Sequence, residues 1–417
     1  MMNMRKRRVV ITGLGLVSPL GNSKEEFWGS LREGKSGIRR ITSFDPTKFP
    51  TQWAAEIENF DPSMFIELKK ARRMDRFVQF AVVSAKTALL DGDLDLGKED
   101  LERIGVFAGT ASGGQGWVFQ QYEVFRDKGF AGLNPFTAAS TFPNAASTHV
   151  SLELGLKGHS DTISSGCASG SAAIGFAFDA VKAGKMDAVF AVGTEALLYP
   201  PIFGAYCAAR VMSRLNGSIP VAPRPFDKNR DGIVLGEGGG AIILEELKHA
   251  IRRGAHVYGE VMGWASTCDA YNIIGYDPEG TQLIRAMKLS LENSGISPHE
   301  VSYIKAHGSG EPVTDKIETK AIKAVFGRNA YQIPISSIKS MIGHTQGASG
   351  VIELIAALLA MEHSEIPPTI NYETVDPDCD LDYVPNVSRK AEIYIVLSNV
   401  MGFGGKNVSI VVKKFRV

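Results

Sequence analysis

The residues with the clearest chemical potential surround Cys167, in the run Ile-Ser-Ser-Gly-Cys-Ala-Ser-Gly-Ser at residues 163–171. Small side chains around a cysteine allow a sharp turn and let a substrate approach the sulfur. The apolar stretch at residues 172–181 predicts a helix directly behind this turn. A helix start offers free N–H groups and the positive end of a dipole, which favours the nucleophilic thiolate. Cys167 is therefore a candidate nucleophile, although a lone cysteine can also be a small core residue.

Three later stretches carry groups that a cysteine acyltransferase needs. His307 follows the apolar strand expected at residues 301–304 and stands at a glycine turn. Lys339 and His344 stand five residues apart in a second stretch. The glycine-rich turn at residues 399–405 could offer backbone N–H groups to an oxyanion. Each feature alone has an ordinary explanation, as a structural histidine, a surface lysine or a plain turn.

The composition excludes several classes of protein. The 417 residues carry 45 basic and 45 acidic side chains, so the chain lacks the basic field that bulk nucleic-acid binding needs. The four cysteines form no CxxC pair and no ligand-like spacing with histidine, which argues against a zinc site or a disulfide framework. The apolar run near the start is short and interrupted by Gly13 and Gly15, and no run is long enough to span a membrane. We therefore expect a cytoplasmic protein with no metal, nucleic-acid or membrane partner.

The elements expected to position these groups occur twice along the chain. In the first part, Ser164 and Ser165 precede Cys167, a helix and a strand at residues 187–192. In the second part, Ser336 and Ser337 precede Lys339, a helix at residues 351–361 and a strand at residues 393–397. The strand at residues 260–263 is a counterpart of the first strand, at residues 8–16.

This repetition predicts a duplicated α/β fold with mixed sheets covered by helices. We place the boundary between the halves at residue 254, giving residues 1–254 with the cysteine and 255–417 with the histidines and the lysine. The chemistry would then lie where loops from both halves converge. Within the first half, Pro135 and Pro143 interrupt what we expect to be an irregular connection to the Cys167 stretch.

In this order and context, the cysteine, the histidine at a glycine turn and the Lys-x4-His stretch closely resemble the β-ketoacyl-acyl-carrier-protein synthases. The resemblance covers nearly the whole chain and includes Arg-Pro-Phe-Asp-Lys-Asn-Arg-Asp-Gly at residues 224–232 and Asp-Ala-Tyr at residues 269–271. It is closest to the type II fatty-acid elongating synthases and to the ketosynthase subunits of type II polyketide systems. It implies a thiolase-like fold with α-β-α-β-α layers and a decarboxylative Claisen condensation. The products would be a 3-oxoacyl-acyl-carrier protein and CO2.

The resemblance also implies a role for each matched residue. Cys167 would take the acyl chain, and His307 and His344 would support decarboxylation of the malonyl-carrier. Lys339 would support this pair electrostatically, with Glu353 as its carboxylate partner. Phe403 would be the gate before the nucleophile, and its N–H and that of Cys167 would form the oxyanion hole. No metal or organic cofactor is implied, because the substrates arrive on the phosphopantetheine of the acyl-carrier protein.

Two regions depart from the family pattern. Near the expected pantetheine arm, Ser309 matches the family, but Glu311 stands where a short hydroxyl residue is usual. In the acyl pocket, to which Tyr206 is also assigned, Ser112, Thr137 and Ala138 are small where elongating synthases carry larger side chains. Removal of that bulk predicts a longer or wider cavity, unless other residues refill it. The alternative function is therefore a ketosynthase subunit of a type II polyketide or polyene system.

The resemblance further implies partners. Lys69, Arg72, Arg73 and Arg210 match positions where the family docks its acidic carrier protein. The fold normally dimerises, so we expect either a homodimer or a heterodimer with a chain-length-factor-like subunit. Thr137 and Ala138 would then lie near the partner chain.

Three other functions remain to be weighed against this one. A degradative thiolase would need a second cysteine near the C-terminal glycine turn, where there is none, and Cys379 lies in a Pro/Asp-rich loop. A cysteine hydrolase would need neither Lys339 nor a second histidine. A silent chain-length subunit usually lacks the nucleophile, so the presence of Cys167 disfavours it.

Overall fold

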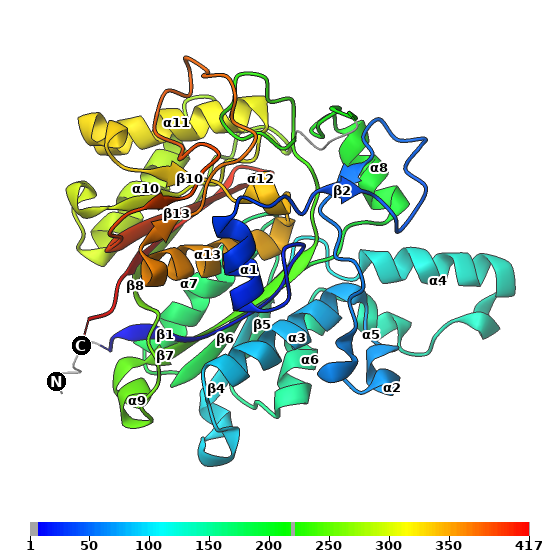
Figure 1. Ribbon diagram of the computed structural model, residues 1–417. Coiled ribbons are helices and arrows are strands. Elements are labelled where there is room, and N and C mark those ends of the chain that lie inside the picture. Colours follow the sequence, from blue (N-terminus) through cyan, green and yellow to red (C-terminus); the bar gives the residue numbers. More distant parts are fainter. Residues whose placement is uncertain (1–6, 218–221, 417) are drawn as a thin grey trace.

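A computed structural model describes residues 7–217 and 222–416 of the chain (Figure 1). The strands are β1 (Val9–Val17), β2 (Arg39–Arg40), β3 (Trp53–Ala54), β4 (Ile104–Gly109), β5 (Ser160–Ile163), β6 (Ala188–Glu195), β7 (Gly238–Glu246), β8 (Gly259–Cys268), β9 (Tyr303–Lys305), β10 (Ile335–Ser336), β11 (Glu365–Ile366), β12 (Arg389–Lys390), β13 (Ile395–Gly402) and β14 (Lys406–Lys413). The α-helices are α1 (Lys24–Arg32), α2 (Leu68–Ala71), α3 (Arg76–Asp91), α4 (Gln115–Lys128), α5 (Thr137–Thr141), α6 (Ala145–Leu154), α7 (Ser169–Lys182), α8 (Pro200–Ala208), α9 (Leu247–Arg252), α10 (Thr281–Ser294), α11 (Pro312–Phe326), α12 (Lys339–Ile342) and α13 (Ser349–His363).

The order of the strands shows that the fold is duplicated. The main sheet runs β10-β9-β13-β14-β8-β1-β7-β6-β4-β5. In the first half, β4 is parallel to β5 and β6, while β7 is antiparallel to β6 and β1. In the second half, β9 is parallel to β10 and β13, while β14 is antiparallel to β13 and β8. The two halves therefore have the same topology, and they join where β1 pairs with β8. The expected boundary at residue 254 falls between α9 and β8.

The alternating directions of side chains along the buried strands assign them to separate hydrophobic cores, one on each face of the sheet. Successive residues of a strand point to opposite faces, so Val189 and Ala191 of β6 pack into the central core, while Phe190 and Val192 pack into a second core. In the other half, Val396 of β13 joins the central core and Leu397 a third core. Each half of the sheet is thus buried on both faces.

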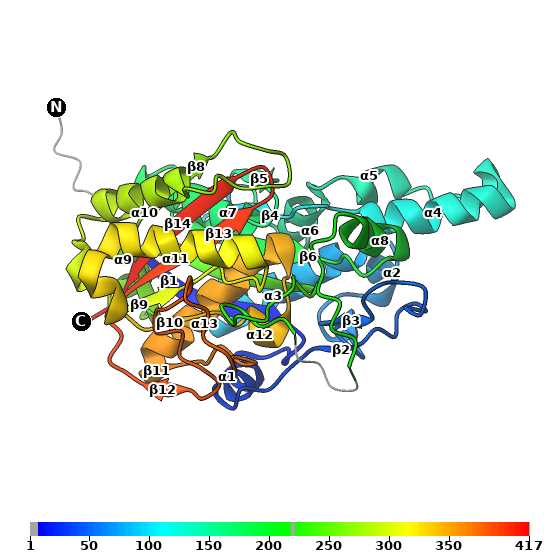
Figure 2. The ribbon, with the colours of Figure 1, turned by 90° about the horizontal axis from the view of Figure 1, so that it is seen from above.

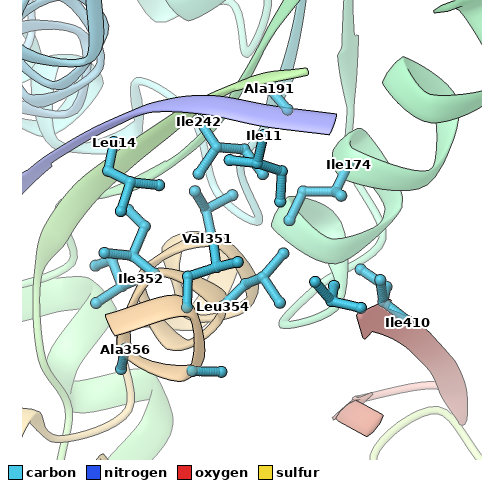
Figure 3. Close-up of a cluster of buried hydrophobic side chains, with 14 of the residues drawn as sticks. Ile11, Leu14, Ile174, Ala191, Ile242, Val351, Ile352, Leu354, Ala356 and Ile410 are labelled. Carbon is cyan, nitrogen blue, oxygen red and sulfur yellow. The ribbon is translucent and has the colours of Figure 1, made fainter. Parts of the chain in front are cut away.

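The central core is built around α7 and α13, which lie between the two halves of the sheet. Figure 3 shows Ile174 of α7 and Val351, Ile352 and Leu354 of α13 among side chains from both halves, such as Ile242. Helices α3 and α6 cover the outer face of the first half, and α10 and α11 cover that of the second (Figures 1 and 2). The layers run α-β-α-β-α, which confirms the expected fold class.

The connection that leads to the Cys167 stretch is not irregular, as the sequence analysis had it. It contains α4, α5 and α6. Helix α4 projects from the body of the molecule (Figures 1 and 2). Gly116, in its first turn, is its only fully buried residue. A helix without a buried apolar stripe lacks the 3.6-residue period by which sequence patterns reveal helices.

In residues 7–217 and 222–416, no helix combines the length and the apolar character that crossing a bilayer requires.

Candidate active site

Cys167 lies in a sharp turn between β5 and α7. Gly166 has a left-handed φ of 61°, and Ser169 Oγ ties the turn together by accepting from Ser165 N–H and donating to the carbonyl of Gly166. The helix starts at Ser169, so its N-terminal end faces the cysteine. The turn and the helix are those expected from the sequence, with the helix beginning three residues earlier than the apolar stretch indicated, whereas the short strand β5 before them was not expected.

The resting state of the sulfur differs from the expectation. Burial raises the pKa of the Cys167 thiol to about 12, although the charge of Lys339 and the N–H groups of Phe403 and Cys167 act in the opposite direction. Desolvation disfavours the charged form more strongly than the helix end favours it. Cys167 is therefore a thiol at neutral pH, and the thiolate expected from the helix start is wrong.

His307 follows β9 at the turn that the sequence predicted. The N–H groups of His307 and Gly308 both donate to the carboxylate of Glu318, each at 2.8 Å. Gly308 has φ of 35°, and a side chain there would collide with Ser337 and the ring of Phe226. The turn is thus fixed by a buried carboxylate and by close backbone packing, which sets the direction of the imidazole.

His344 follows α12 and comes from the same half of the molecule. Its N–H donates to the carbonyl of Val234 at 2.7 Å, and its Nδ1 accepts from Gln346 N–H at 3.2 Å. An acceptor role for Nδ1 places the ring proton on Nε2. The two imidazole rings lie 5.3 Å apart, centroid to centroid, with 76° between their planes.

Both imidazoles are neutral near pH 7. Burial lowers the pKa of His307 and of His344 well below the usual value, and the positive charge of Lys339 lowers both further. Two neutral rings can each donate an N–H bond to a developing oxyanion.

Behind the histidines lies a buried cluster of charges. Lys339 Nζ donates to the carbonyl of His307 at 2.7 Å and pairs with Glu353, which is fully buried. Lys305 Nζ pairs with the other oxygen of the same carboxylate. Burial and the nearby charge of Lys339 together lower the pKa of Lys305 to about 8, against the raising effect of Glu353.

The sequence analysis predicted the pairing of Lys339 with Glu353 but missed that Lys305 pairs with the same carboxylate. Lys305 stands two residues before His307, so its place next to the site was visible in the sequence. Its shared carboxylate partner was not, because Glu353 comes from a helix far along the chain.

One pocket collects most of the predicted groups. Its volume is about 160 Å³. The residues that line it are Cys167, Val211, Ile233, Ile274, Gly275, Tyr276, His307, Ser309, Glu311, Val313, Thr314, His344, Gln346 and Phe403. Cys167, Val211 and Ile233 come from the first half and the others from the second, so loops of both halves converge here as expected. Gln346 and Tyr276 are pocket residues that the sequence analysis missed.

Ser309 and Glu311 lie at the start of α11, on one wall of this pocket. Ser309 Oγ is 2.9 Å from the hydroxyl of Thr314. Glu311 caps the helix, because its Oε2 accepts from Val313 N–H at 3.0 Å and from Thr314 N–H at 2.7 Å. Glu311 therefore has a structural task in addition to its place on the wall.

None of the four residues assigned to the acyl pocket lines the pocket at Cys167. Ser112 follows β4, and its N–H donates to Glu195. Thr137 and Ala138 belong to α5, where the Thr137 hydroxyl donates to the carbonyl of Asn134 at 2.7 Å. Tyr206 lies beside Phe403, the expected gate, with the two ring centroids 6.3 Å apart.

The basic residues expected to dock a carrier lie on the surface. Lys69, Arg72 and Arg73 line a shallow hollow together with Phe136, over whose ring the guanidinium of Arg73 lies at 4.4 Å. Arg210 is exposed just after α8 and precedes Val211, which lines the pocket.

Cys379 does not lie in this pocket. It is buried in the core of the second half, with Tyr383 and Leu381. Within the part of the chain that the structure describes, no group of three or more His, Cys, Asp or Glu side chains is arranged to hold a metal ion.

Comparisons with known proteins agree with this geometry. Family models match residues 6–250 as "Beta-ketoacyl synthase, N-terminal domain" and residues 258–373 as "Beta-ketoacyl synthase, C-terminal domain". A relative from Synechocystis sp., the 3-oxoacyl-[acyl-carrier-protein] synthase 2, is 44% identical over 416 residues and covers 100% of both chains.

Two solved structures have the same fold at 33% identity. One is a ketosynthase bound to the hexaketide, in complex with its type II polyketide acyl-carrier protein, with a TM-score of 0.91 and 99% of this chain and 100% of that chain covered. The other is the ishigamide ketosynthase/chain length factor, with a TM-score of 0.92 and the same coverage. On these full-length matches, and on the pocket that joins its two halves, the chain belongs to the β-ketoacyl synthase family of condensing acyltransferases.

Proposed function

We propose that this chain condenses a carrier-bound acyl chain with malonyl-acyl-carrier protein, giving 3-oxoacyl-acyl-carrier protein and CO2, as in type II fatty-acid synthesis. The observation that carries the proposal is the single pocket in which Cys167, His307 and His344 meet, with Lys339 bonded to the main chain of His307 directly behind it. A thiol nucleophile and two neutral imidazoles are what acyl transfer followed by decarboxylation needs.

In the first half-reaction, the sulfur of Cys167 attacks the carbonyl carbon of the acyl thioester. The new S–C bond forms, the bond to the pantetheine sulfur breaks, and the proton of Cys167 leaves with the pantetheine thiol. The N–H groups of Cys167 and Phe403 would bind the transient oxyanion. Both groups are close enough to the sulfur to lower the pKa of its thiol.

In the second half-reaction, malonyl-carrier loses CO2, and the electron pair of the broken C–C bond forms an enolate. His307 and His344 would each donate a hydrogen bond to its oxygen. Among the described residues His307 Nδ1 is buried without a hydrogen-bond partner, as expected of a group whose bonds a substrate completes. The enolate carbon then attacks the acyl-Cys167 carbonyl, and the thiol of Cys167 is regenerated with the proton that the medium supplies.

Lys339 and Glu353 are proposed as the electrostatic support of this step. Lys339 holds the carbonyl of His307 and keeps positive potential behind both rings, which disfavours their protonation. Glu353 balances the charge in a fully buried site, where an unpaired ammonium group is costly.

The substrates would reach the pocket on a phosphopantetheine arm. Ser309 and Glu311 line the same wall as Thr314, so Thr314 supplies a hydroxyl where the sequence lacks one at position 311. The donors of this chain suffice for the steps above, and we propose that no metal or organic cofactor takes part.

We propose that Lys69, Arg72, Arg73 and Arg210 dock an acidic carrier protein. The first three share one surface hollow, and Arg210 lies next to the pocket residue Val211. Rim charges of this kind mainly set the rate of encounter and its salt dependence.

We propose a dimer, either of two copies or with a chain-length-factor-like subunit. Strand β5 forms one end of the sheet and is largely exposed, so its edge is free to pair. The projecting segment nearby exposes large apolar side chains, namely Val118, Tyr122, Phe125, Phe130, Phe136 and Phe142. A partner covering this segment would also bring Thr137 and Ala138 towards its own acyl pocket.

A polyketide or polyene substrate is the second candidate. It is favoured by the two polyketide-type structures of the same fold, and by the small side chains at Ser112, Thr137 and Ala138 if the acyl chain extends beyond the pocket at Cys167. The identity of 44% with a 3-oxoacyl-[acyl-carrier-protein] synthase 2 supports the fatty-acid function more strongly.

We further propose that the chain works in the cytoplasm and divides at residue 254. The balanced charge and the free cysteines support the first proposal. The matched five-strand halves, with the boundary between α9 and β8, support the second.

The test is intact mass analysis of the purified protein after incubation with a panel of acyl-carrier thioesters. We expect an acyl adduct on the native chain and none on the Cys167→Ala variant. Fatty acyl groups should load if the first candidate holds, and oxygenated or unsaturated chains should load preferentially if the second does. Absence of any adduct would refute both.

A further inference from the structure

Gln346 touches the nucleophile. Its Oε1 accepts from the thiol of Cys167, with 2.8 Å between sulfur and oxygen. The side chain lines the pocket and is 2% exposed. Its backbone has φ of 46°, in the left-handed region that residues other than glycine rarely adopt. A strained conformation held at a pocket is common where it positions a functional group.

The surroundings of Gln346 hold that conformation in place. Its own N–H donates to Nδ1 of His344 at 3.2 Å, and the N–H of Gly347 donates to Glu195 at 3.0 Å. Glu195 is fully buried and also accepts from Ala111 N–H at 2.6 Å. The backbone at Gln346 is therefore anchored independently of its side chain, which points to the sulfur.

The other end of the amide has no protein partner. Within residues 7–217 and 222–416, Nε2 of Gln346 makes no hydrogen bond, and the atom is not fully buried, so it is open to the pocket that the side chain lines. An amide carries an acceptor and a two-hydrogen donor of nearly equal size. Its last torsion is broad and roughly two-fold, so a half-turn exchanges the oxygen for the NH2 group.

We propose that Gln346 is a further catalytic residue, whose amide accepts from the Cys167 thiol at rest and donates to the sulfur when negative charge develops on it during acyl transfer. The inference rests on the proposed function. In the transfer the S–C bond to the acyl carbon forms, the acyl–S(pantetheine) bond breaks with its electron pair going to the pantetheine sulfur, and the Cys167 proton ends on that sulfur. Gln346 neither gains nor loses a proton.

A donor from Gln346 would add to the groups that already favour negative charge on the sulfur, namely the N–H groups of Cys167 and Phe403 and the start of α7. Lys339, the nearest positive charge behind the pocket, is already bonded to Glu353 and to the carbonyl of His307. The N–H groups of Cys167 and Phe403 are required by the oxyanion of the substrate. An uncharged amide stabilises the sulfur without placing a charge in the path of an acyl chain.

The test is alkylation of Cys167 by iodoacetamide, followed by peptide mass spectrometry from neutral to alkaline pH. We expect Gln346→Leu to react at least about tenfold more slowly at neutral pH, a factor worth about 1.4 kcal/mol. Its rate–pH curve should move to higher pH. The exposed Cys268 of the same molecule is the internal control and should react equally in all variants.

Gln346→Glu is the second, nearly isosteric variant, and it keeps the inference testable if the leucine variant does not fold. We expect it to react more slowly still, because a carboxylate beside the sulfur disfavours the thiolate. Native reactivity and an unshifted curve in either folded variant would overturn the proposal.

This readout separates the inference from the proposed function, because iodoacetamide needs no carrier. If the native protein is alkylated at Cys167 but takes no acyl group from any carrier, the proposed function fails, and the alkylation rates still decide the role of Gln346. If acyl groups load at equal rates in native and Gln346→Leu protein, the inference fails and the function stands.

Discussion

Substitution of Gly402 by alanine is a direct test of the oxyanion hole. Gly402 ends β13, and a methyl group there would lie 3.1 Å from the nitrogen of Cys167, 3.4 Å from that of Ala168 and 3.4 Å from the carbonyl oxygen of Ser165. All three neighbours are main-chain atoms, so none can swing aside as a side chain could. The turn that carries Cys167 must therefore shift by a few tenths of an ångström.

The size of the effect follows from this displacement. Complete loss of one oxyanion donor costs about 2.7–4 kcal/mol, or roughly 10²–10³ in rate. A displaced donor costs less, and we expect a fall of about 10- to 100-fold in the rate of acyl loading. The free energy of unfolding should fall by about 1–3 kcal/mol, the usual cost of overpacking, with no added backbone strain because Gly402 lies in a strand.

The assay is the time course of acyl-enzyme formation, followed by intact mass after mixing with an acyl-carrier thioester. The matched control is Gly404→Asn in the same turn. Gly404 has φ of 77° and open space where a side chain would go, and asparagine tolerates that φ. We expect the control to load at close to the native rate. If folded Gly402→Ala loads as fast as native protein, or if the control loses as much, the N–H of Cys167 is not the donor.

Four further predictions follow from other parts of the site. Glu353→Gln leaves two buried ammonium groups without their shared carboxylate, so urea titration should show a loss of about 3–5 kcal/mol, and an unchanged midpoint would contradict the shared pair. The two active-site histidines have pKa values well below 6.5, and the neutral ring persists above its own pKa. CO2 release from malonyl-carrier should therefore stay level as the pH falls through 6.5, and a decline centred there would be evidence against neutral imidazole donors. Reversal of charge at Arg72 and Arg210 should raise the KM for the carrier substrate and leave turnover of a free acyl thioester intact, whereas equal losses on both would argue against docking. Ser112→Phe should shorten the products if the acyl chain extends past the pocket to the end of β4, and unchanged chain lengths would remove the case for a wider pocket.

Much of the active site could be predicted because its signals are local. Small residues before an apolar stretch indicated the turn and helix at Cys167, and strands that end in glycine turns indicated the positions of His307 and Phe403. The duplicated order of elements was also visible along the chain. These features depend on backbone conformation and on the period of apolar residues, which the sequence carries directly.

The features that were missed depend on neighbours distant in the chain. Helix α4 gave no signal because it buries no apolar face. The role of Gln346 depends on its contact with Cys167, and that of Lys305 on its contact with Glu353. The protonation of Cys167 was predicted wrongly for the same reason, since the helix end is local but the depth of burial is a property of the whole fold.

The convergence of loops from both halves on one pocket has a consequence for the growing polypeptide. Cys167 precedes His307, His344 and Phe403 in the chain, so it is synthesised before the second half that contributes them. A nascent or truncated chain therefore exposes a cysteine without the groups that would let it react with acyl donors. The complete pocket therefore forms only when the second half has folded against the first.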